Sequence, residues 1–585
     1  MGRLYLALFS ACWPEPAHPG SLIDSGRAPY ITAGLRMPAA RAAIMFPLLL
    51  LVASLAPFVA ASPVARSSKS GFLCGIPFFS YGCEQTRADP LTIVTSLGTA
   101  MGSLTSDGAY RFPVKFANAD RWKASSVVDK WELPNGADDA TATPKACPQP
   151  DMDDSEYSED CLSMILYVPP NLSVLGGVPT LMWVHGGSFY VGSASNDGLD
   201  GSKLAIATGS IVAVVQYRLG ALGFMAPDGG TNLAVQDVMN AMKFVQSVVT
   251  SFGGSSRITL AGQSSGANMI RALLATPSAD SLFESAILQS DTIDYGFLTP
   301  STQSTLQSHF NGLIDCADGS DSCTSALSLS AILDASASLF SDAHNLDPSA
   351  TQFAPMRPVH DGALITSALD LTSSPFPSVS KPILLTTVAN EAAPTIYGNM
   401  PALGAEYFFS IAAASYGDDR TETLENSTYY STEGVSDIRT VLEKLGTDSI
   451  WRCPAWSLAR LWAGAGANAY VGVYTRGATY PSNSGVSQCA SGGLVCHEDD
   501  IYIVFGTTPN ASSAQSALTK EVQARYKAFM QGGKPNAGGY AKWGKAGAND
   551  VKPLNLGGTD AIEVGACDPG FWGKEVEYDY QVYGA

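Results

Sequence analysis

The stretch Gly262-Gln263-Ser264-Ser265-Gly266 decides the fold, because its flanks place a Gly-x-Ser-x-Gly motif between a strand and a helix. Residues 257–261 before it form an apolar, β-prone run, and residues 267–274 after it favour a helix. A nucleophile elbow requires this strand–turn–helix context, with the serine at the tip of a strained turn. The two glycines are needed because a side chain at either position would clash across the turn. We therefore predict that Ser264 is a nucleophile.

The fold expected around this elbow belongs to the α/β class. Residues 163–168, 180–184 and 211–215 are continuous apolar runs that we expect to form buried strands, and residues 233–248 have a helical pattern. Buried strands that alternate with helices are typical of a large, mostly parallel central sheet covered by helices on both faces. Because no repeat or low-complexity linker interrupts the pattern, we expect residues 62–585 to form a single domain.

Composition and charge limit the classes of function. The chain has 585 residues, of which 46% are hydrophobic, so it has ample material for a core. Its formal net charge is −19, and an acidic protein repels phosphate backbones, so we expect no nucleic-acid partner. The charge is compatible with a soluble protein outside the cell, and solubility alone is enough to explain it.

The N-terminal residues 1–61 are expected to be an upstream leader followed by a secretory signal peptide. Residues 45–61 read MFPLLLLVASLAPFVAA, with Arg36 and Arg41 upstream and the small residues Val59 and Ala61 suitably placed for cleavage. The apolar stretch is short for a membrane span and no stop-transfer pattern follows it. We therefore expect a secreted, extracellular protein without a stable membrane anchor.

Cysteines and glycosylation motifs agree with export. The chain has 11 cysteines, and in an oxidising compartment most of them are expected to be paired. Cys12 belongs to the leader, so the remaining even number could form disulfides throughout. The tripeptides that begin at Asn171, Asn426 and Asn510 fit the acceptor motif for N-glycosylation.

Several further motifs follow one another in a recognisable order. They are EDCL (159–162), HGGSF (185–189), YRLGALGF (217–224), FGG (252–254), GQSSGA (262–267), VANEA (388–392) and HEDDIYIVFG (497–506). In this order and spacing they resemble the type-B carboxylesterase/lipase family, which is cholinesterase-like, and the chain is most similar to secreted fungal members. The resemblance implies an α/β-hydrolase fold.

The same resemblance implies a catalytic triad. Ser264 corresponds to the nucleophile, His497 to the general base and Glu391 to the acid that orients the base. These residue types make chemical sense, since a serine hydroxyl needs an imidazole to take its proton and the imidazole needs a carboxylate to fix its tautomer. His497 is the only histidine after Glu391, which fits the order serine, acid, histidine. Asp361 is the alternative acid. We interpret the other histidines after Ser264 as structural or surface residues: His309, His344 and His360.

A Gly-rich turn, His185–Phe189, directly follows the expected strand at 180–184. Such a turn can point consecutive backbone N–H groups into a cleft and so form an oxyanion hole. A tight turn that merely needs small residues is the alternative. The resemblance implies that the oxyanion donors are the backbone N–H groups of Gly187, Ser188 and Ser265.

The resemblance also implies which cysteines pair. The implied disulfides are Cys147–Cys161, Cys316–Cys323 and Cys453–Cys567, and elimination leaves Cys74–Cys83 and Cys489–Cys496 as local pairs. We expect no metal site, because the Cys496-His497 dipeptide lacks the number of ligands that zinc requires.

Two departures from the family pattern bear on the substrate. Gln263 replaces the glutamate that usually precedes the nucleophile, so a negative charge that would favour cationic substrates is missing. The loop between Cys147 and Cys161 is acidic, has only 13 residues and contains no tryptophan. It offers neither the aromatic platform that binds choline esters nor the long amphipathic lid of related lipases.

The function expected from the sequence is a secreted serine hydrolase that cleaves small-molecule or lipid carboxylic esters through an acyl-enzyme, without a cofactor. A lipase or sterol esterase for long-chain, water-insoluble esters is the first alternative. The second is a non-catalytic binding scaffold, although such relatives typically lose the nucleophile.

Overall fold

The computed structural model describes residues 89–584, apart from residues 171, 173–175, 317–318 and 492. The expected leader and signal peptide (1–61) and the expected start of the domain at residue 62 lie outside these residues. The export signal and the single-domain assignment therefore stay predictions. The expected Cys74–Cys83 pair and the glycosylation site at Asn171 also lie outside the described residues.

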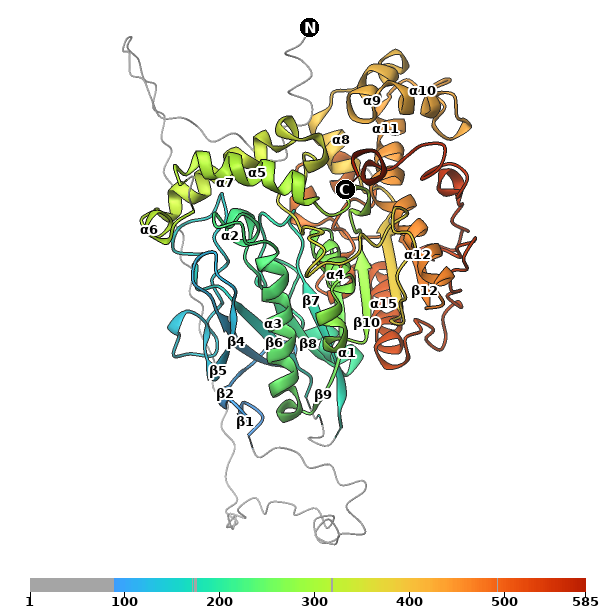
Figure 1. Cartoon of the computed structure of the whole chain (residues 1–585). Coiled ribbons are helices and arrows are strands. Elements are labelled where there is room, and N and C mark those ends of the chain that lie inside the picture. Colours follow the sequence, from blue (N-terminus) through green and yellow to red (C-terminus); the bar gives the residue numbers. More distant parts are fainter. Residues whose placement is uncertain (1–88, 171, 173–175, 317–318, 492, 585) are drawn as a thin grey trace, which may run out of the picture. The chain divides into compact units, whose positions relative to one another are not determined.

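One mixed, mostly parallel sheet organises the described residues (Figure 1). Its strands are β3 Ser103–Leu104, β4 Tyr110–Asn118, β5 Ser126–Glu132, β6 Ser163–Val168, β7 Val178–Val184, β8 Ile211–Val215, β9 Gly254–Gln263, β10 Ser285–Gln289, β11 Ile383–Val388, β12 Ala469–Tyr474 and β13 Leu554–Leu556. The spatial order is β13-β12-β11-β10-β9-β7-β8-β6-β4-β3, and β5 pairs with β4. All neighbours from β13 to β8 are parallel, whereas β6, β4, β3 and β5 extend the sheet with antiparallel pairs. A separate hairpin pairs β1 Thr92–Thr95 with β2 Gly98–Met101.

Helices occupy many of the connections between these strands, and one helix, α16, follows the last strand. They are α1 Ser202–Thr208, α2 Gly220–Phe224, α3 Leu233–Val248, α4 Ser265–Leu274, α5 Pro300–Leu313, α6 Asp321–Thr324, α7 Leu329–Leu346, α8 Ala393–Asn399, α9 Phe408–Tyr416, α10 Asp418–Glu425, α11 Arg439–Gly446, α12 Cys453–Gly464, α13 Ser487–Ala490, α14 Ile501–Phe505, α15 Ser513–Gly532 and α16 Asp579–Tyr583.

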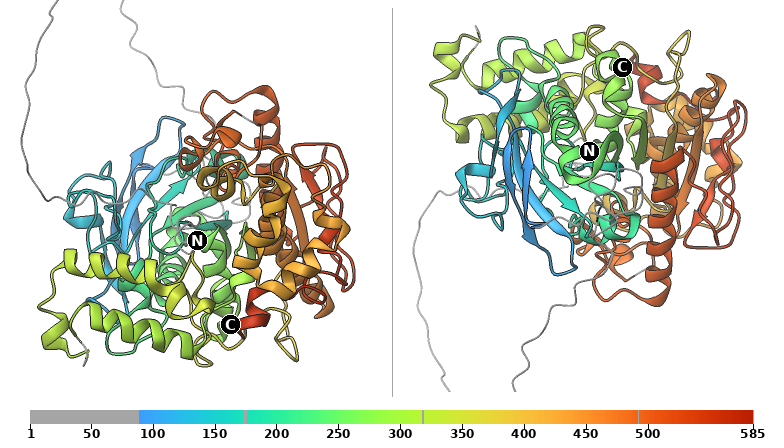
Figure 2. Two further views of the ribbon diagram at one scale, coloured as in Figure 1. Left: turned by 90° about the horizontal axis from the view of Figure 1, so that it is seen from above. Right: turned by 90° about the horizontal axis from the view of Figure 1, so that it is seen from below.

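The helices cover both faces of the sheet, as predicted. Figure 2 shows helices on both sides of the sheet. One hydrophobic cluster contains residues of α3, α4 and α12, and another contains residues of α1, α14 and α15. Strands buried on both faces must be apolar throughout, which explains why β6 and β8 have no exposed residue. The sequence-based bounds of β6, β8 and α3 are confirmed, and the run 180–184 lies within β7.

Four disulfides are formed among the described residues. Three are the pairs that the family resemblance implied, and the fourth is the pair left by elimination: Cys147–Cys161, Cys316–Cys323, Cys453–Cys567 and Cys489–Cys496. The third spans 114 positions of sequence and attaches the C-terminal segment to α12. Within the described residues, no helix has the length and apolar character needed to cross a bilayer.

Loss of the long-range disulfide should destabilise the protein more than loss of a short-range one. Replacing both Cys453 and Cys567 with alanine should lower the free energy of unfolding by about 4–5 kcal/mol. The disulfide closes a very long loop and so restricts the unfolded chain, and the variant's unfolded chain regains that entropy. The same change at Cys316 and Cys323, which are 7 positions apart, should cost about 2–3 kcal/mol. Urea denaturation of the three proteins tests this order, and equal losses would contradict it.

Candidate active site

Ser264 connects β9 to α4 in a strained backbone conformation, with φ 57° and ψ −128°. The turn is tight on both sides. A Cβ added at Gly262 would lie 2.7 Å from the carbonyl oxygen of Val184, and one added at Gly266 would lie 2.2 Å from the same oxygen. The amide of Ser264 donates a hydrogen bond to Gln289 O on the neighbouring strand β10 at 2.8 Å. The structure thus forms the strand–turn–helix elbow that the sequence predicts.

Glu391 and His497 meet beyond the carboxyl end of β11. Glu391 Oε2 lies 2.6 Å from His497 Nδ1, and Glu391 Oε1 accepts a hydrogen bond from the amide of Val388 at 2.8 Å. The carboxylate is only 1% exposed. A carboxylate fixed on both oxygens orients the ring and keeps its proton on Nδ1. The Nε2 atom of the neutral imidazole is then a hydrogen-bond acceptor.

The loop that contains His497 is attached to the loop that contains Glu391. The amide of Asn390 donates to Val495 O at 2.9 Å, and the disulfide Cys489–Cys496 closes the chain immediately before the histidine. Asn483 Nδ2 donates to the carbonyl oxygen of His497 at 2.6 Å. These contacts keep the imidazole in place although it comes from a long irregular connection.

The surroundings of His497 raise its pKa above the ordinary histidine value. Burial alone would lower the pKa, but the hydrogen bond to Glu391 and the charge of that carboxylate outweigh the burial. The acidic side chains of Glu498 and Asp500 add to the increase. The ring therefore gains a proton more readily than a free imidazole, as a base next to a buried carboxylate does.

The hydrogen-bond partner of His497 Nε2 is the side-chain amide of Gln263, at 3.1 Å between the two nitrogens. Since Nδ1 keeps the ring proton, Gln263 Nε2 donates and His497 Nε2 accepts. Gln263 is fully buried, and its Oε1 has no partner among the described residues. In the described part of the chain, the Ser264 hydroxyl forms no hydrogen bond with the imidazole. The sequence predicted a direct partnership between serine and histidine, and did not predict this role for Gln263.

The Gly-rich turn after β7 packs against the elbow. Gly187 has φ 111°, and a Cβ there would lie 2.2 Å from Val191 O, so this position requires glycine. The backbone amides of Gly187, Ser188 and Ser265 donate to no acceptor within the described residues. Ser188 and Ser265 line the same cavity as Ser264. Unpaired amides beside a nucleophile are the donors that an oxyanion requires.

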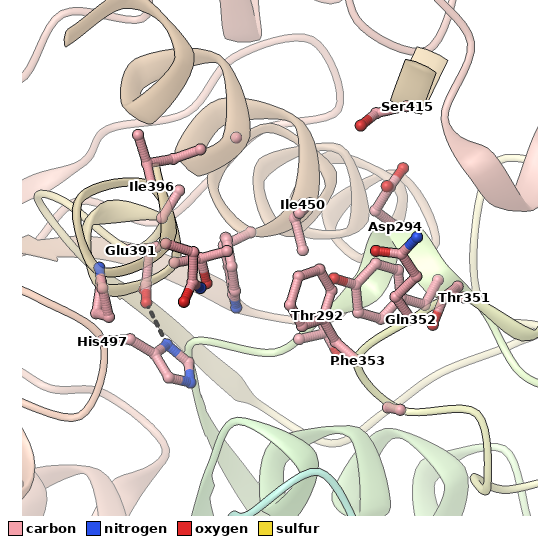
Figure 3. A pocket seen from close by; sticks show the side chains of 18 of the residues that line it. Thr292, Asp294, Thr351, Gln352, Phe353, Glu391, Ile396, Ser415, Ile450 and His497 are labelled. Carbon is pink, nitrogen blue, oxygen red and sulfur yellow. Dashed lines mark hydrogen bonds and ion pairs between the residues drawn. The ribbon is translucent and has the colours of Figure 1, made fainter. Parts of the chain in front are cut away.

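Ser188, Ser264 and Ser265 line a cavity of about 530 Å³. Figure 3 shows this cavity from close by. Much of its wall is apolar and comes from α8, α9 and α11 and the connections next to them: Ile396, Ile411, Leu442, Leu445, Ile450 and Trp451. Trp451 lies on the π-helix Thr447–Arg452, and its ring centroid is 5.4 Å from that of His497. No sequence pattern singled out these wall residues. Concave, mostly apolar sites with a few polar groups are typical of small-molecule binding.

The alternative acid, Asp361, does not lie at this site. Its Oδ1 accepts hydrogen bonds from the amides of residues 363–365, and its Oδ2 accepts from Thr231 and Asn232. Asp361 organises its own turn and does not line the cavity. The carboxylate beside His497 is that of Glu391.

The other histidines after Ser264, the acidic loop and the glycosylation sites lie in different places. His309 pairs with Asp342, whereas His344 lies on the cavity wall, which its sequence context did not indicate. His360 does not line the cavity. The acidic stretch 151–160 forms the expected loop, and none of residues 148–160 lines the cavity. Asn426 and Asn510 are exposed, as a glycosylation site must be.

Comparison with known proteins identifies the family. Residues 93–566 match the model of the Carboxylesterase family. Para-nitrobenzyl esterase from Bacillus subtilis (strain 168) is 35% identical over 216 residues, which are 34% of this chain and 43% of that protein. Carboxylesterase 1D from Mus musculus is 25% identical over 417 residues, which are 66% of this chain and 72% of that protein.

A solved structure of PNB esterase shares the fold. It has a TM-score of 0.65 and 22% sequence identity, and the match covers 80% of this chain and 96% of that one. Some curated relatives align over less of their length: the chain spans 43% of the Bacillus esterase and 33% of Carboxylesterase 3 from Pongo abelii. The family model, in contrast, matches most of the chain from residue 93 onward, and the protein therefore belongs to the carboxylesterase family.

Proposed function

We propose that the protein is a serine hydrolase that cleaves carboxylic esters through an acyl-enzyme. The observation that supports this most strongly is the 2.6 Å pair of Glu391 and His497, which lines one cavity together with the strained Ser264. In this assignment Ser264 is the nucleophile, His497 the general base and Glu391 the acid that orients it. Membership of the carboxylesterase family supports the reaction type.

The reaction has two half-reactions. The Ser264 oxygen attacks the ester carbonyl carbon while its proton moves to His497 Nε2, and the amides of Gly187, Ser188 and Ser265 bind the oxyanion of the tetrahedral intermediate. The ester C–O bond then breaks, and the Nε2 proton moves to the leaving alkoxide. Water, deprotonated by the same imidazole, attacks the acyl-enzyme and releases the acid and Ser264. These steps need no cofactor.

Gln263 acts in this scheme as a positioning residue. Its NH₂ group matches the neutral imidazole, whose Nε2 accepts. After proton transfer Nε2 becomes a donor, and the same NH₂ group no longer matches it. The neutral imidazole has a single lone pair at Nε2, so this hydrogen bond must open before Nε2 takes the proton of Ser264. A neutral glutamine holds the ring without adding charge, whereas an ionised glutamate stabilises the imidazolium.

We also propose secretion and glycosylation. Four disulfides among the described residues fit an oxidising compartment, and Asn426 and Asn510 are exposed.

A second candidate activity, on long-chain esters, is favoured by the apolar cavity wall. The loop 148–160 lies apart from that cavity and gives it no lid.

Replacing Ser264 with alanine should lower the hydrolysis of p-nitrophenyl esters at least about 1000-fold, because the acyl-enzyme can no longer form. The assay should use acyl chains from acetyl to palmitoyl, since the preferred length separates an esterase from a lipase. Ser308→Ala removes a hydroxyl exposed on α5 and should keep the wild-type rate. A Ser264→Ala rate within tenfold of the wild type would refute the nucleophile assignment.

Replacing Gln263 with glutamate should move the acid limb of the kcat/KM profile to higher pH by about one unit. A carboxylate beside Nε2 stabilises the imidazolium, so the pKa of His497 rises and less neutral base is present at a given pH. Gln263→Met removes the amide without adding charge and should shift the limb less. Profiles measured from pH 4 to 9 test the idea, and superimposable acid limbs for wild type and Gln263→Glu would count against a contact between residue 263 and the base.

A further inference from the structure

The end of the cavity away from Glu391 and His497 is polar. Asp294, Thr351 and Gln352 line it, and Figure 3 shows them across the cavity from the Glu391–His497 pair. None of these three residues has a part in the proposed hydrolysis. Their side chains can therefore indicate which chemical group the substrate has at the end remote from the scissile bond.

Two acidic residues from distant parts of the chain meet at this end, the buried Asp294 and the half-buried Asp579. Asp294 belongs to the short 3-10 helix η4 (Ile293–Tyr295) after β10, and Asp579 begins α16. The amide of Asp579 donates to Asp294 Oδ1 at 2.9 Å, and Arg420 Nη1 donates to Asp579 Oδ1 at 2.8 Å. Both acids line the cavity, but only Asp579 has an ion-pair partner.

The two carboxyl groups differ in what surrounds them and therefore in how their pKa values shift. Burial, followed by the nearby charge of Asp579, raises the pKa of Asp294 well above its usual range. Burial also raises the pKa of Asp579, but the charge and hydrogen bond of Arg420 oppose this. Of the two carboxyl groups, Asp294 therefore holds a proton more readily, because only Asp579 has a cationic partner. A protonated carboxyl group donates one hydrogen bond and accepts others, and a hydroxyl group has the same capacity.

Thr351 adds a second polar group to this end, independently of the acids. Its side chain is only 6% exposed, and its Oγ1 has no hydrogen-bond partner among the described residues. Thr351 follows the 3-10 helix η5 (Pro348–Ala350) with φ 63° and lines the cavity. A buried hydroxyl without a partner costs roughly 1–3 kcal/mol, and a polar ligand group in the cavity would remove that cost.

The segments with these polar groups are held in fixed positions. Arg357 is fully buried, and its Nη2 donates to Tyr295 O and Ser349 O at 2.8 Å each, so one guanidinium joins η4 to η5. Helix α16 packs against both of these short helices. Groups held in this way can bind a ligand without first losing conformational freedom.

Half of the acid pair comes from outside the family match. The match to the Carboxylesterase family ends at residue 566, whereas Asp579 lies in the segment that follows. The matched residues therefore contain Asp294 but not Asp579.

We propose that Asp294, Thr351 and Asp579 form a subsite for a hydroxyl group, and that the preferred substrates are esters with a hydroxyl at the end remote from the scissile carbonyl. This deepens the proposed ester hydrolysis and rests on it. Asp294 and Thr351 contact the substrate hydroxyl, while Asp579, held by Arg420, fixes Asp294.

The test compares matched esters that differ only in a terminal hydroxyl. One series pairs p-nitrophenyl alkanoates with their ω-hydroxy analogues, and the other pairs acetates of alkanols with monoacetates of diols, each over a range of chain lengths. At the length that spans the cavity, kcat/KM for the hydroxylated ester should exceed that for the plain ester about tenfold. A ratio near one at every length in both series would overturn the proposal.

Substitutions at the subsite test whether it causes the preference for the hydroxylated ester. Asp294→Leu and Thr351→Val should each bring the ratio toward one, whereas Asp294→Asn, which mimics the protonated carboxyl, should keep it within about threefold. Asp342→Leu alters a half-exposed acid outside the cavity and should leave the ratio at the wild-type value. Loss of the ratio in Asp294→Asn, with a preference for amino-substituted esters in the wild type, would show an ionised site and refute a hydroxyl subsite.

The ratio also separates this proposal from the proposed function. Hydrolysis of both esters without a preference would refute the subsite alone. If neither ester were hydrolysed by the folded wild-type protein, the proposed hydrolase function itself would be wrong. Thermal unfolding of each variant, together with its turnover of the plain ester, shows whether a changed ratio comes from a folded enzyme.

Discussion

The whole site depends on a backbone-to-backbone contact between the end of β7 and the turn after β9. A Cβ at Gly186 would lie 2.8 Å from Gln263 O, and a Cβ at Gly266 would lie 2.7 Å from His185 O. Only glycine allows the two chains to approach so closely. The same contact sets the Gly-rich turn against Ser264, so the proposed oxyanion donors and the proposed nucleophile cannot move independently.

The parallel sheet explains how the remaining groups reach the same place. The strands β9, β10 and β11 are parallel neighbours, so the segments that follow them leave the sheet at one edge. These segments contain Ser264, Asp294 and Glu391 respectively. His497 has no strand immediately before it, and hydrogen bonds and a disulfide position its loop instead. The rigid sheet thus supplies most of the site, and cross-links supply the rest.

The sequence predicted the elements of the sheet well because their signals are local. The apolar runs of β6 and β8, the helical pattern of α3 and the glycines around Ser264 are all visible within a few residues. The family resemblance and the apolar run 382–388 directly before it favoured Glu391 over Asp361. The structure shows why the alternative fails: Asp361 uses its oxygens for its own turn and for Thr231 and Asn232.

The contacts that the sequence could not predict join residues far apart in the chain. Gln263 meets His497 across 234 positions, and the amide of Asp579 meets Asp294 across 285. Arg357, which joins η4 to η5, lies in no motif, and its partners are backbone oxygens that any sequence offers. Such contacts arise from packing, so neither local pattern nor spacing indicates them.

The separation of the acidic loop 148–160 from the cavity has an evolutionary consequence. In this chain the part of the surface next to the Cys147–Cys161 bridge and the walls that select a substrate are different pieces of structure. Substitutions at the exposed positions of the loop therefore change the charge of the surface without altering a wall of the cavity. The exposed surface of the loop and the walls of the cavity can therefore change separately in evolution.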